Sequence, residues 1–412
     1  MNIRPSIYAI RNYGFKGIIN YVLRKPKEWA IRHSMKRTLR PIPPESGITL
    51  IYCFDESNSL SKVMRDFAIM LKRTNIPYQT FNMPCANPIP KCEHESFMTP
   101  MQDFCLNKYT HIITMRNALR IPDERCHVHC IEFWEFEDGF VECCPEALRA
   151  SNVLALSEFN QEVFRKTLPS TISVQKVLYP FQFLHGELMP RKSVREKYHI
   201  GAEDFMVFFN FDFASSYFRK NPEGILQAFA KALGNKPNAT LVFKTMRAKK
   251  CKVLNDRLHA LANSLGLSSK LITIDDFIPQ EDLVNLTNAC DVYMSLHRGE
   301  GFGLGIAEAM SLGKAIIVTD YSSTTEFCNS KDSMPIPYKL VSVPPSQVDV
   351  DAYRYVTSWA EPDISAAAEA LEKLYLNPDL RDELGHQAMT FIREHFSTTN
   401  FRKSIESLLS SD

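Results

Sequence analysis

The sequence predicts an α/β protein of two domains, each built on a parallel sheet covered by helices. Apolar runs of strand length alternate with amphipathic runs of helix length from Gly47 onward, which is the pattern of βα units. The length of 412 residues is too great for one ordinary core and suits two domains of roughly 100–200 residues each. The alternation is interrupted between 179 and 200, where prolines and a charged run appear, and we place the domain boundary there.

The first half of the chain predicts a sheet of six strands. Strands are expected at 48–54, 78–83, 111–115, 128–134, 153–156 and 174–178, with helices at 60–75 and 158–168 and a proline-containing loop at 84–100. Strands that alternate with helices favour a parallel sheet with both faces covered. We assign residues 47–185 to an N-terminal domain.

The second half repeats the alternation more regularly. Strands are expected at 206–211, 240–244, 271–274, 291–296 and 315–319, and helices at 222–233, 253–265, 281–290 and around Glu308, followed by helices near 364–376, 379–395 and 399–410. We assign 186–395 to a C-terminal domain and 396–412 to a final helix, with packing back on the N-terminal domain as one option. Two such domains place ligands beyond the carboxyl ends of their strands, so a cleft between them is the expected site.

Composition excludes several classes of protein. A net charge of +1 gives no global electrostatic support for a nucleic-acid partner. No segment approaches the roughly 20 apolar residues of a membrane span, and the N-terminus lacks the apolar core of a secretory signal. Eleven cysteines, an odd number at irregular spacings, favour reduced thiols. We therefore expect a cytoplasmic protein.

Residues 1–46 form a basic zone with ten Lys/Arg against two acids. Ile18, Ile19, Val22 and Leu23 recur at helical spacing before Pro26, which predicts a short basic amphipathic helix. Peripheral contact with an anionic membrane, at the inner face of the plasma membrane through residues 1–40, is one interpretation. Packing of this helix on its own domain or on a partner is equally compatible with the pattern.

The stretch 291–326 concentrates the residues that suit a polyol attached to a phosphate. Glycines at 301, 303 and 305 leave backbone amides unshielded just before a helix, and the free amides of a helix start attract anions and hydroxyl oxygens. Glu300 in the loop and Glu308 one turn into the helix can each accept two hydroxyl hydrogen bonds. A surface helix would explain Glu308 alone, but not its combination with Glu300 and the glycines.

Cations occur where this topology needs them for a phosphate. Arg219 and Lys220 lie between a strand and a helix that can begin at Pro222, and Lys244 ends the next strand. Two cations at strand ends can neutralise a diphosphate without a metal ion. Solvated surface charge is the alternative for any single lysine, and their shared location argues against it.

Two other clusters carry less weight. In Cys126-His127-Val128-His129-Cys130 the strand alternation sends cysteines and histidines to opposite faces, so we expect no metal site. Phe133 to Asp138 joins aromatic rings and carboxylates, as sugar recognition requires, although core aromatics beside solvated acids would look the same.

The segment from Ser295 to Lys314, with its Glu300-x7-Glu308 spacing, Phe302-Gly303-Leu304 and Glu308-Ala309-Met310, resembles the family-4 (group 1) retaining glycosyltransferases of the GT-B fold. Further matches are Arg219-Lys220-Asn221-Pro222, Lys244, Trp359-Ala360-Glu361-Pro362, and Trp134 with Glu137. The matched motifs are most similar to those of enzymes of bacterial surface-polysaccharide or lipopolysaccharide assembly. The resemblance implies two Rossmann-like domains that face each other across a cleft, with C-terminal helices.

The resemblance also implies a role for each matching residue. Glu300 is implied at the donor sugar hydroxyls, and the amides of Gly301, Phe302, Gly303 and Leu304 at the sugar and diphosphate. Glu308 is implied at the ribose, Lys220 and Lys244 at the diphosphate, and Phe277 with Ile278 against the base. Arg219 is a further donor-binding residue. Of these, Glu300, Lys220 and Lys244 are the implied catalytic residues. Trp134, Glu137 and Ser59 are acceptor-side candidates, and neither a metal nor a cofactor is implied.

Three departures from the family pattern concern the ligand-binding loops. Ser59-Leu60-Ser61 replaces a glycine-rich turn after the first strand, Ser322 to Thr325 replaces a Ser-Gly-Asn run, and the arginine expected after 206–211 has no match. The family's N-domain catalytic histidine has no clear counterpart either.

The function implied is metal-independent, retaining transfer of a hexose from a UDP- or GDP-linked sugar to a glycan or lipid-linked saccharide acceptor in cell-surface polysaccharide biosynthesis. A catalytically weak homologue that serves as a scaffold subunit is the alternative of another class. A GT-B epimerase or phosphorylase shares the fold, but no pyridoxal-lysine motif is evident. An NAD-dependent reductase fits the fold class only, because no Gly-x-Gly-x-x-Gly follows the first strand.

Overall fold

The computed structural model describes residues 44–54, 59–83, 99, 105–115, 126–183, 188–275 and 277–410. Most of the predicted basic segment 1–46, and with it the predicted membrane contact, lies outside these residues, as does nearly all of the predicted loop at 84–100. The described residues form two compact units: the first takes those up to Phe133, those of 140–182 and those from Phe396 onward, and the second takes 134–139 and 183–395. The predicted first domain, 47–185, includes 134–139, whereas the structure groups that segment with the second unit.

The first unit contains a six-stranded parallel sheet in the order β2-β1-β3-β4-β5-β6. Its strands are β1 (Glu45–Tyr52), β2 (Tyr78–Asn82), β3 (Tyr109–Met115), β4 (His127–Ile131), β5 (Asn152–Ala155) and β6 (Ser173–Lys176). Its helical segments are α2 (Ser59–Thr74), α3 (Phe140–Cys143), η4 (Pro145–Arg149), α4 (Glu158–Thr167) and α13 (Thr398–Leu409). Ser59 is the first residue of α2, so the predicted turn at Ser59–Ser61 is helical in the structure.

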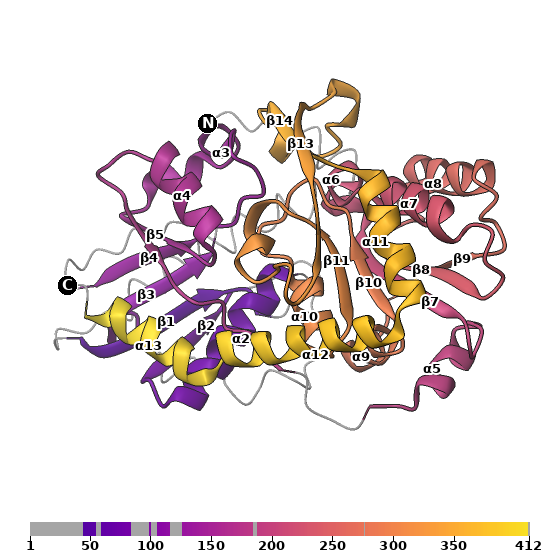
Figure 1. The fold of residues 1–412 in the computed structure, drawn as a ribbon. Coiled ribbons are helices and arrows are strands. Elements are labelled where there is room, and N and C mark those ends of the chain that lie inside the picture. Colours follow the sequence, from indigo (N-terminus) through magenta and orange to yellow (C-terminus); the bar gives the residue numbers. More distant parts are fainter. Residues whose placement is uncertain are drawn as a thin grey trace. The chain divides into compact units, whose positions relative to one another are not determined.

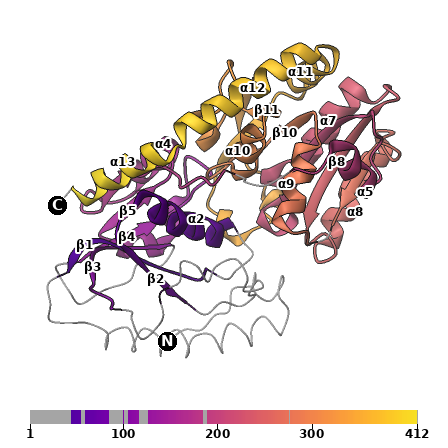
Figure 2. The ribbon, with the colours of Figure 1, turned by 90° about the horizontal axis from the view of Figure 1, so that it is seen from below.

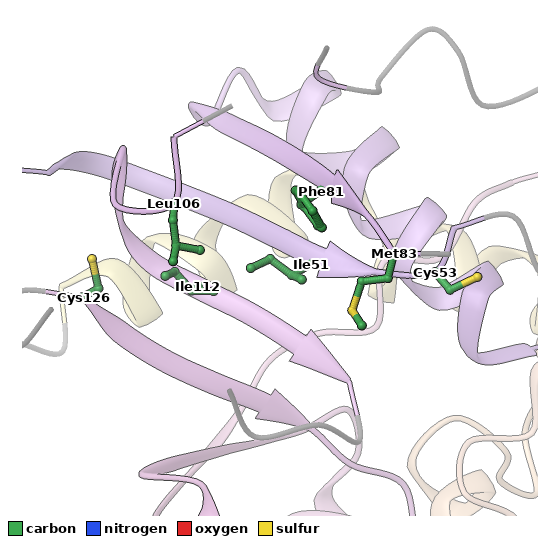
Figure 3. Close-up of a cluster of buried hydrophobic side chains, with 7 residues drawn as sticks. All are labelled: Ile51, Cys53, Phe81, Met83, Leu106, Ile112 and Cys126. Carbon is green, nitrogen blue, oxygen red and sulfur yellow. The ribbon is translucent and has the colours of Figure 1, made fainter. Parts of the chain in front are cut away.

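Apolar side chains fill both faces of this first sheet. On one face the buried cluster comprises Ile51, Cys53, Phe81, Met83, Leu106, Ile112 and Cys126 (Figure 3). The helices α2 and α13 pack against each other (Figure 2), and Phe67 meets Phe401 edge to face with ring centroids 5.7 Å apart. The final helix therefore belongs to the core of the first unit.

The second unit contains a parallel sheet in the order β12-β11-β10-β7-β8-β9 (Figure 1). Its strands are β7 (Phe205–Asp212), β8 (Ala239–Met246), β9 (Leu271–Ile274), β10 (Val292–Ser295), β11 (Ala315–Thr319) and β12 (Met334–Ile336). Its α-helices are α5 (Arg191–Lys197), α6 (Tyr217–Lys220), α7 (Pro222–Leu233), α8 (Lys252–Ser264), α9 (Gln280–Asn288), α10 (Leu304–Ser311), α11 (Ile364–Leu376) and α12 (Pro378–His395). Short 3-10 turns lie at η5 (Phe213–Ser215), η6 (Ser322–Glu326), η7 (Pro345–Gln347) and η8 (Asp351–Tyr353). The predicted α/β class with parallel sheets is confirmed.

The strand order of the second sheet fixes where a ligand can bind. From β7 the chain moves outward through β8 to β9, and it then returns to the other side of β7 as β10 and β11. Because crossovers between parallel strands are right-handed, the connections before and after this return lie on opposite faces of the sheet. Accordingly, α7 packs with α8 and α11, while α10 packs with α9 and α12. The order thus reverses between β7 and β10, and ligands of open α/β sheets bind beyond the carboxyl ends of such strands.

One predicted strand is too long, and the predicted boundary segment contains a helix. The strand predicted at 128–134 ends at Ile131, and the chain from Trp134 to Gly139 groups with the second unit instead of continuing the strand. The predicted boundary segment 179–200 includes the division between the two units, after Gln182, and it also contains α5. In α5 the buried Arg195 donates to the carbonyls of Asp204 and Ala289 and pairs with Asp291 at 2.9 Å.

The antiparallel hairpin of β13 (Tyr338–Ser342) and β14 (Ser358–Pro362) was not predicted. Its first strand is largely exposed and shows no apolar alternation, so its sequence carries no strand signal. Among the described residues no helix is long and apolar enough to cross a membrane.

Candidate active site

The loop between β10 and α10 is shaped by a glycine in the left-handed region. Gly303 has φ +92° and immediately precedes α10, and a Cβ at this position would lie 2.6 Å from the Thr324 methyl carbon. L-residues pay about 1–2 kcal/mol for this conformation, which glycine adopts freely. The helix consequently begins without a side-chain cap, directly after the loop that carries Glu300.

Glu300 is buried and paired with two cations. It is 7% exposed, and its carboxylate contacts the Lys220 ammonium and lies 3.4 Å from Nη1 of Arg219. Burial alone would raise the pKa of Glu300, but the charges of Lys220 and Arg219 outweigh it and lower the pKa to about 2. The carboxylate is therefore ionised at neutral pH and can only accept hydrogen bonds.

Arg219 supports the backbone of this loop. It is 4% exposed, and its guanidinium donates to the carbonyl oxygens of Gly299 at 2.7 Å and Ser215 at 3.0 Å. Glu135, from the segment 134–139, lies 3.9 Å from its Nη2. Most of the guanidinium is thus committed to protein groups, which makes Arg219 a residue that positions the loop around Glu300.

The junction between α6 and α7 holds Lys220 beside the loop that carries Glu300. Asn221 adopts a left-handed conformation with φ 53°, and its Oδ1 caps α7 by accepting from the Gly224 amide at 3.1 Å. Its Nδ2 donates to the carbonyl of Leu296 at 2.9 Å, at the end of β10. Pro222 fills the first helical position, where no amide hydrogen is needed. Asn221 therefore fixes the lysine beside the loop that holds Glu300.

Arg298 joins the same loop to the β13–β14 hairpin. Its guanidinium makes two hydrogen bonds with the Glu361 carboxylate, at 2.6 and 2.8 Å, and donates to the Phe218 carbonyl at 2.7 Å. The guanidinium also lies over the Trp359 ring, 4.9 Å from its centroid. The unpredicted hairpin thus gives the Trp359-Ala360-Glu361-Pro362 motif a structural role.

A second acid of the hairpin region supports α6. Asp349 accepts hydrogen bonds from the Ser216 hydroxyl and the Tyr217 amide, both at 2.6 Å. A carboxylate at a helix start satisfies amides that have no partner within the helix. Asp349 thereby fixes the beginning of the segment that ends in Arg219 and Lys220.

His297 is a buried core residue within the loop. Its Nε2 lies 3.2 Å from the Tyr321 carbonyl and its Nδ1 lies 3.2 Å from the Ser295 hydroxyl. Because a carbonyl only accepts, Nε2 carries the proton and Nδ1 accepts from the serine. Burial, the largest cause, lowers the pKa of His297 to about 4, so the ring is neutral and anchors the loop.

The other donor-site candidates lie on strand β8, in the segment after β9 and on helix α10. Lys244 near the end of β8 is 5% exposed and donates to the Thr245 carbonyl at 2.7 Å. Glu308 is half-buried on α10. Phe277, beyond β9, is 67% exposed, and Ile278 is half-buried. Their predicted contacts with a nucleotide stay predictions.

The acceptor-side candidates belong to different units, and their predicted contacts with an acceptor stay predictions. Trp134 is 1% exposed; its indole nitrogen donates to the Asp138 carbonyl at 2.7 Å, and it packs edge to face with Phe136 and Tyr353. It is a core residue with no ring face open to a sugar. Glu137 is exposed in the second unit and Ser59 is exposed in the first.

The histidines of the first sheet stack on one another, His111 with His127 and with His129. Nδ1 of His111 lies 3.0 Å from Nε2 of His129, while the Cys130 thiol donates to Glu132. Burial and the neighbouring His111 and His127 lower the pKa of His129 to about 3. Among the described residues no three His, Cys, Asp or Glu groups are arranged to hold a metal ion.

Sequence reasoning missed several supporting residues of this site, which act through contacts that only folding creates: Glu135, Asn221, His297, Arg298 and Asp349. Glu135 had a weak signal, since it adjoins the aromatic-acidic motif of Trp134 and Glu137. Arg298 and Asn221 stand inside matched motifs, but the motifs do not state their partners.

Similarity to known proteins is concentrated in the second unit. Residues 211–391 match the family model of glycosyl transferases group 1. The serotype-specific mannosyltransferase WbdA of Escherichia coli is 29% identical over 221 residues, which are 50% of this chain and 25% of WbdA. The chain thus spans about a quarter of the length of the first curated relatives it matches.

Solved structures extend the likeness to both units. Anabaena Alr3699/HepE, in complex with UDP and glucose, has a TM-score of 0.59 and 15% identity, covering 89% of this chain and 100% of that one. WaaG, a glycosyltransferase involved in lipopolysaccharide biosynthesis, has a TM-score of 0.58 and 12% identity over 89% and 100%. At this low identity the structural similarity shows the fold alone. The similarity confirms the predicted GT-B fold. Residues 211–391, within which Glu300, Lys220 and Arg219 gather, thus match the family of group 1 glycosyl transferases.

Proposed function

We propose that this chain is a retaining glycosyltransferase that moves a hexose from a nucleotide diphosphate sugar to a glycan or lipid-linked saccharide acceptor in cell-surface polysaccharide biosynthesis. The observation that carries the proposal is the ionised Glu300 carboxylate, held between Lys220 and Arg219 in the loop before α10. This loop follows β10, at the switch point of the second sheet. An acceptor-only group suits sugar hydroxyls, and neighbouring cations suit a diphosphate.

The proposed mechanism is electrostatic. Lys220, Lys244 and the amides at the start of α10 stabilise the negative charge that develops on the departing diphosphate, while Glu300 holds the donor sugar through its hydroxyls and Glu308 holds the ribose. The bond from the anomeric carbon to the phosphate oxygen breaks while the acceptor oxygen bonds to the same carbon from the same face, which retains configuration. The acceptor hydroxyl passes its proton to the departing diphosphate. Preorganised donors of this kind contribute roughly 10²–10³ each in rate. No metal ion or cofactor takes part in the proposed reaction.

Known proteins of similar sequence or fold support the substrate classes. WbdA is a mannosyltransferase, which supports a hexose. HepE binds UDP-glucose and WaaG takes part in lipopolysaccharide biosynthesis, which supports a nucleotide sugar and a surface-glycan acceptor. We place the reaction in the cytoplasm, with residues 1–40 as the segment to test for membrane contact.

Nucleotide binding tests the donor class. A thermal-shift panel of UDP, GDP, ADP and CMP should show stabilisation by one diphosphate, of about 2.7 kcal/mol at 100 times its dissociation constant. The same panel with EDTA should give the same shift if no metal ion is needed. A chain that responds to no nucleotide would contradict the proposed function.

Two variants separate binding from turnover. Glu308→Ala should weaken nucleotide binding, whereas Glu300→Gln should keep nucleotide binding and lose transfer, measured as nucleoside diphosphate release in the presence of acceptor. Nuclear magnetic resonance of the product should show the anomeric configuration of the donor. If wild-type protein binds nucleotide but releases none with any glycan or lipid-linked acceptor, the scaffold alternative replaces the transferase.

A further inference from the structure

Asn210 lies at the switch point of the second sheet, at the carboxyl end of β7. Its register partner on β8 is Lys244, and two residues earlier Phe208 is the partner of Tyr293 on β10. Side chains of register partners in parallel strands share a face, and residues two apart in a strand also share a face. Asn210, Lys244 and Tyr293 therefore project from the same face of the sheet, next to the loop that carries Glu300.

Tyr293 orients the Asn210 side chain. The buried Tyr293 hydroxyl donates to Oδ1 of Asn210 at 2.7 Å. Burial, followed by the Glu300 and Glu308 charges, holds the pKa of Tyr293 well above its usual range, so the hydroxyl keeps its proton. With Oδ1 occupied, the two N–H groups of Nδ2 point away from the tyrosine, and within the described residues they donate to no protein group.

The first turn of α10 lies directly over this pair. A Cβ on Gly305 would lie 2.5 Å from the Tyr293 hydroxyl oxygen and 3.0 Å from Oδ1 of Asn210. Only glycine lets the helix start approach so closely, because a side chain would displace the tyrosine or the amide. The free Nδ2 group thus opens beside the amides of the helix start, which attract anions.

We propose that Asn210 is a donor-binding residue whose Nδ2 amide donates a hydrogen bond to a diphosphate oxygen of the nucleotide sugar, and that Tyr293 is the residue that positions it. The inference rests on the proposed function. Lys220 and Lys244 already supply two positive charges for the diphosphate. The neutral Asn210 amide adds a hydrogen bond of fixed direction and no further charge. Half-buried Asn210 reaches the ligand from the strand, whereas Lys220 reaches it from the α6–α7 junction.

Calorimetric titration with UDP and GDP tests the assignment. For whichever diphosphate binds wild-type protein, Asn210→Ala should raise the dissociation constant about 10-fold, the usual effect of losing a hydrogen bond to a charged group. Asn210→Asp should raise it further, because a carboxylate repels the phosphate. Asn255→Ala, which removes a half-buried amide on α8, is the matched control and should bind like wild type.

A double-mutant cycle separates positioning from general destabilisation. Tyr293→Phe should weaken binding by a smaller factor, and Tyr293→Phe combined with Asn210→Ala should match Asn210→Ala alone, because the hydroxyl acts only through the amide. Asn210→Ala binding within twofold of wild type, or additive losses in the cycle, would overturn the inference and leave the proposed function standing. If wild-type protein binds neither diphosphate, the proposed function and this inference are both contradicted.

Discussion

Replacing Glu300 by glutamine should destabilise the protein in a pH-dependent way. The pKa of Glu300 falls from its ordinary 4.5 to about 2 in the folded state. Each pKa unit corresponds to about 1.4 kcal/mol, so ionised Glu300 stabilises the folded state by about 3 kcal/mol at pH 7. Glutamine imitates the protonated carboxyl and should forfeit this stabilisation.

The sign of the pH effect follows from the lowered pKa. Stability from a carboxylate with a depressed pKa is fully present above the unfolded value of 4.5 and is lost as pH falls through the folded value of about 2. The difference between wild type and Glu300→Gln should therefore shrink from about 3 kcal/mol at pH 7 to roughly 1 kcal/mol at pH 3.

Thermal unfolding at the two pH values measures this difference. For a unit of roughly 150–250 residues, 3 kcal/mol corresponds to about 6–12 °C in Tm. The control variant Glu369→Gln changes an exposed carboxylate on α11 and should shift Tm little at either pH. Equal Tm differences at pH 7 and pH 3, or none at pH 7, would refute the assignment of a stabilising ion pair to Glu300.

Three further substitutions test the frame around the loop by thermal unfolding. Gly303→Ala should lower the free energy of unfolding by about 2 kcal/mol or more, because the left-handed backbone strains alanine and its Cβ would meet Thr324. An unchanged Tm would contradict the left-handed conformation of Gly303. Asn221→Ala should lower the free energy of unfolding by about 2 kcal/mol, because the α7 cap and one buried hydrogen bond are lost. A loss below about 0.5 kcal/mol would contradict this role of Asn221. Glu361→Gln should cost about 1 kcal/mol, because its partner Arg298 keeps other contacts, and it should lower transfer activity more than nucleotide affinity if the hairpin positions Glu300.

Motif residues were predictable where local pattern determines local structure. The apolar run before Ser295 predicts a buried strand, and the glycines around Phe302 predict a loop followed by a helix. Glu300 and Lys220 stand out because charged residues rarely occur without a role in segments that adjoin buried strands. Their approach to each other across 80 residues follows from the parallel strand order, which alternating elements imply only in outline.

The sequence by itself determined the α/β class, the two-domain organisation and the placement of Glu300 and the cations at strand ends, because these depend on periodicity and on glycine and proline positions. Only the tertiary structure decided that Arg219 is buried under the loop, that Trp134 is core, and that Tyr293 aims Asn210. These facts depend on partners distant in sequence, such as Gly299 for Arg219. The neighbours of a polar residue in the sequence do not indicate which distant carbonyl or hydroxyl will be its hydrogen-bond partner. That partner is determined by burial and by the order of the strands.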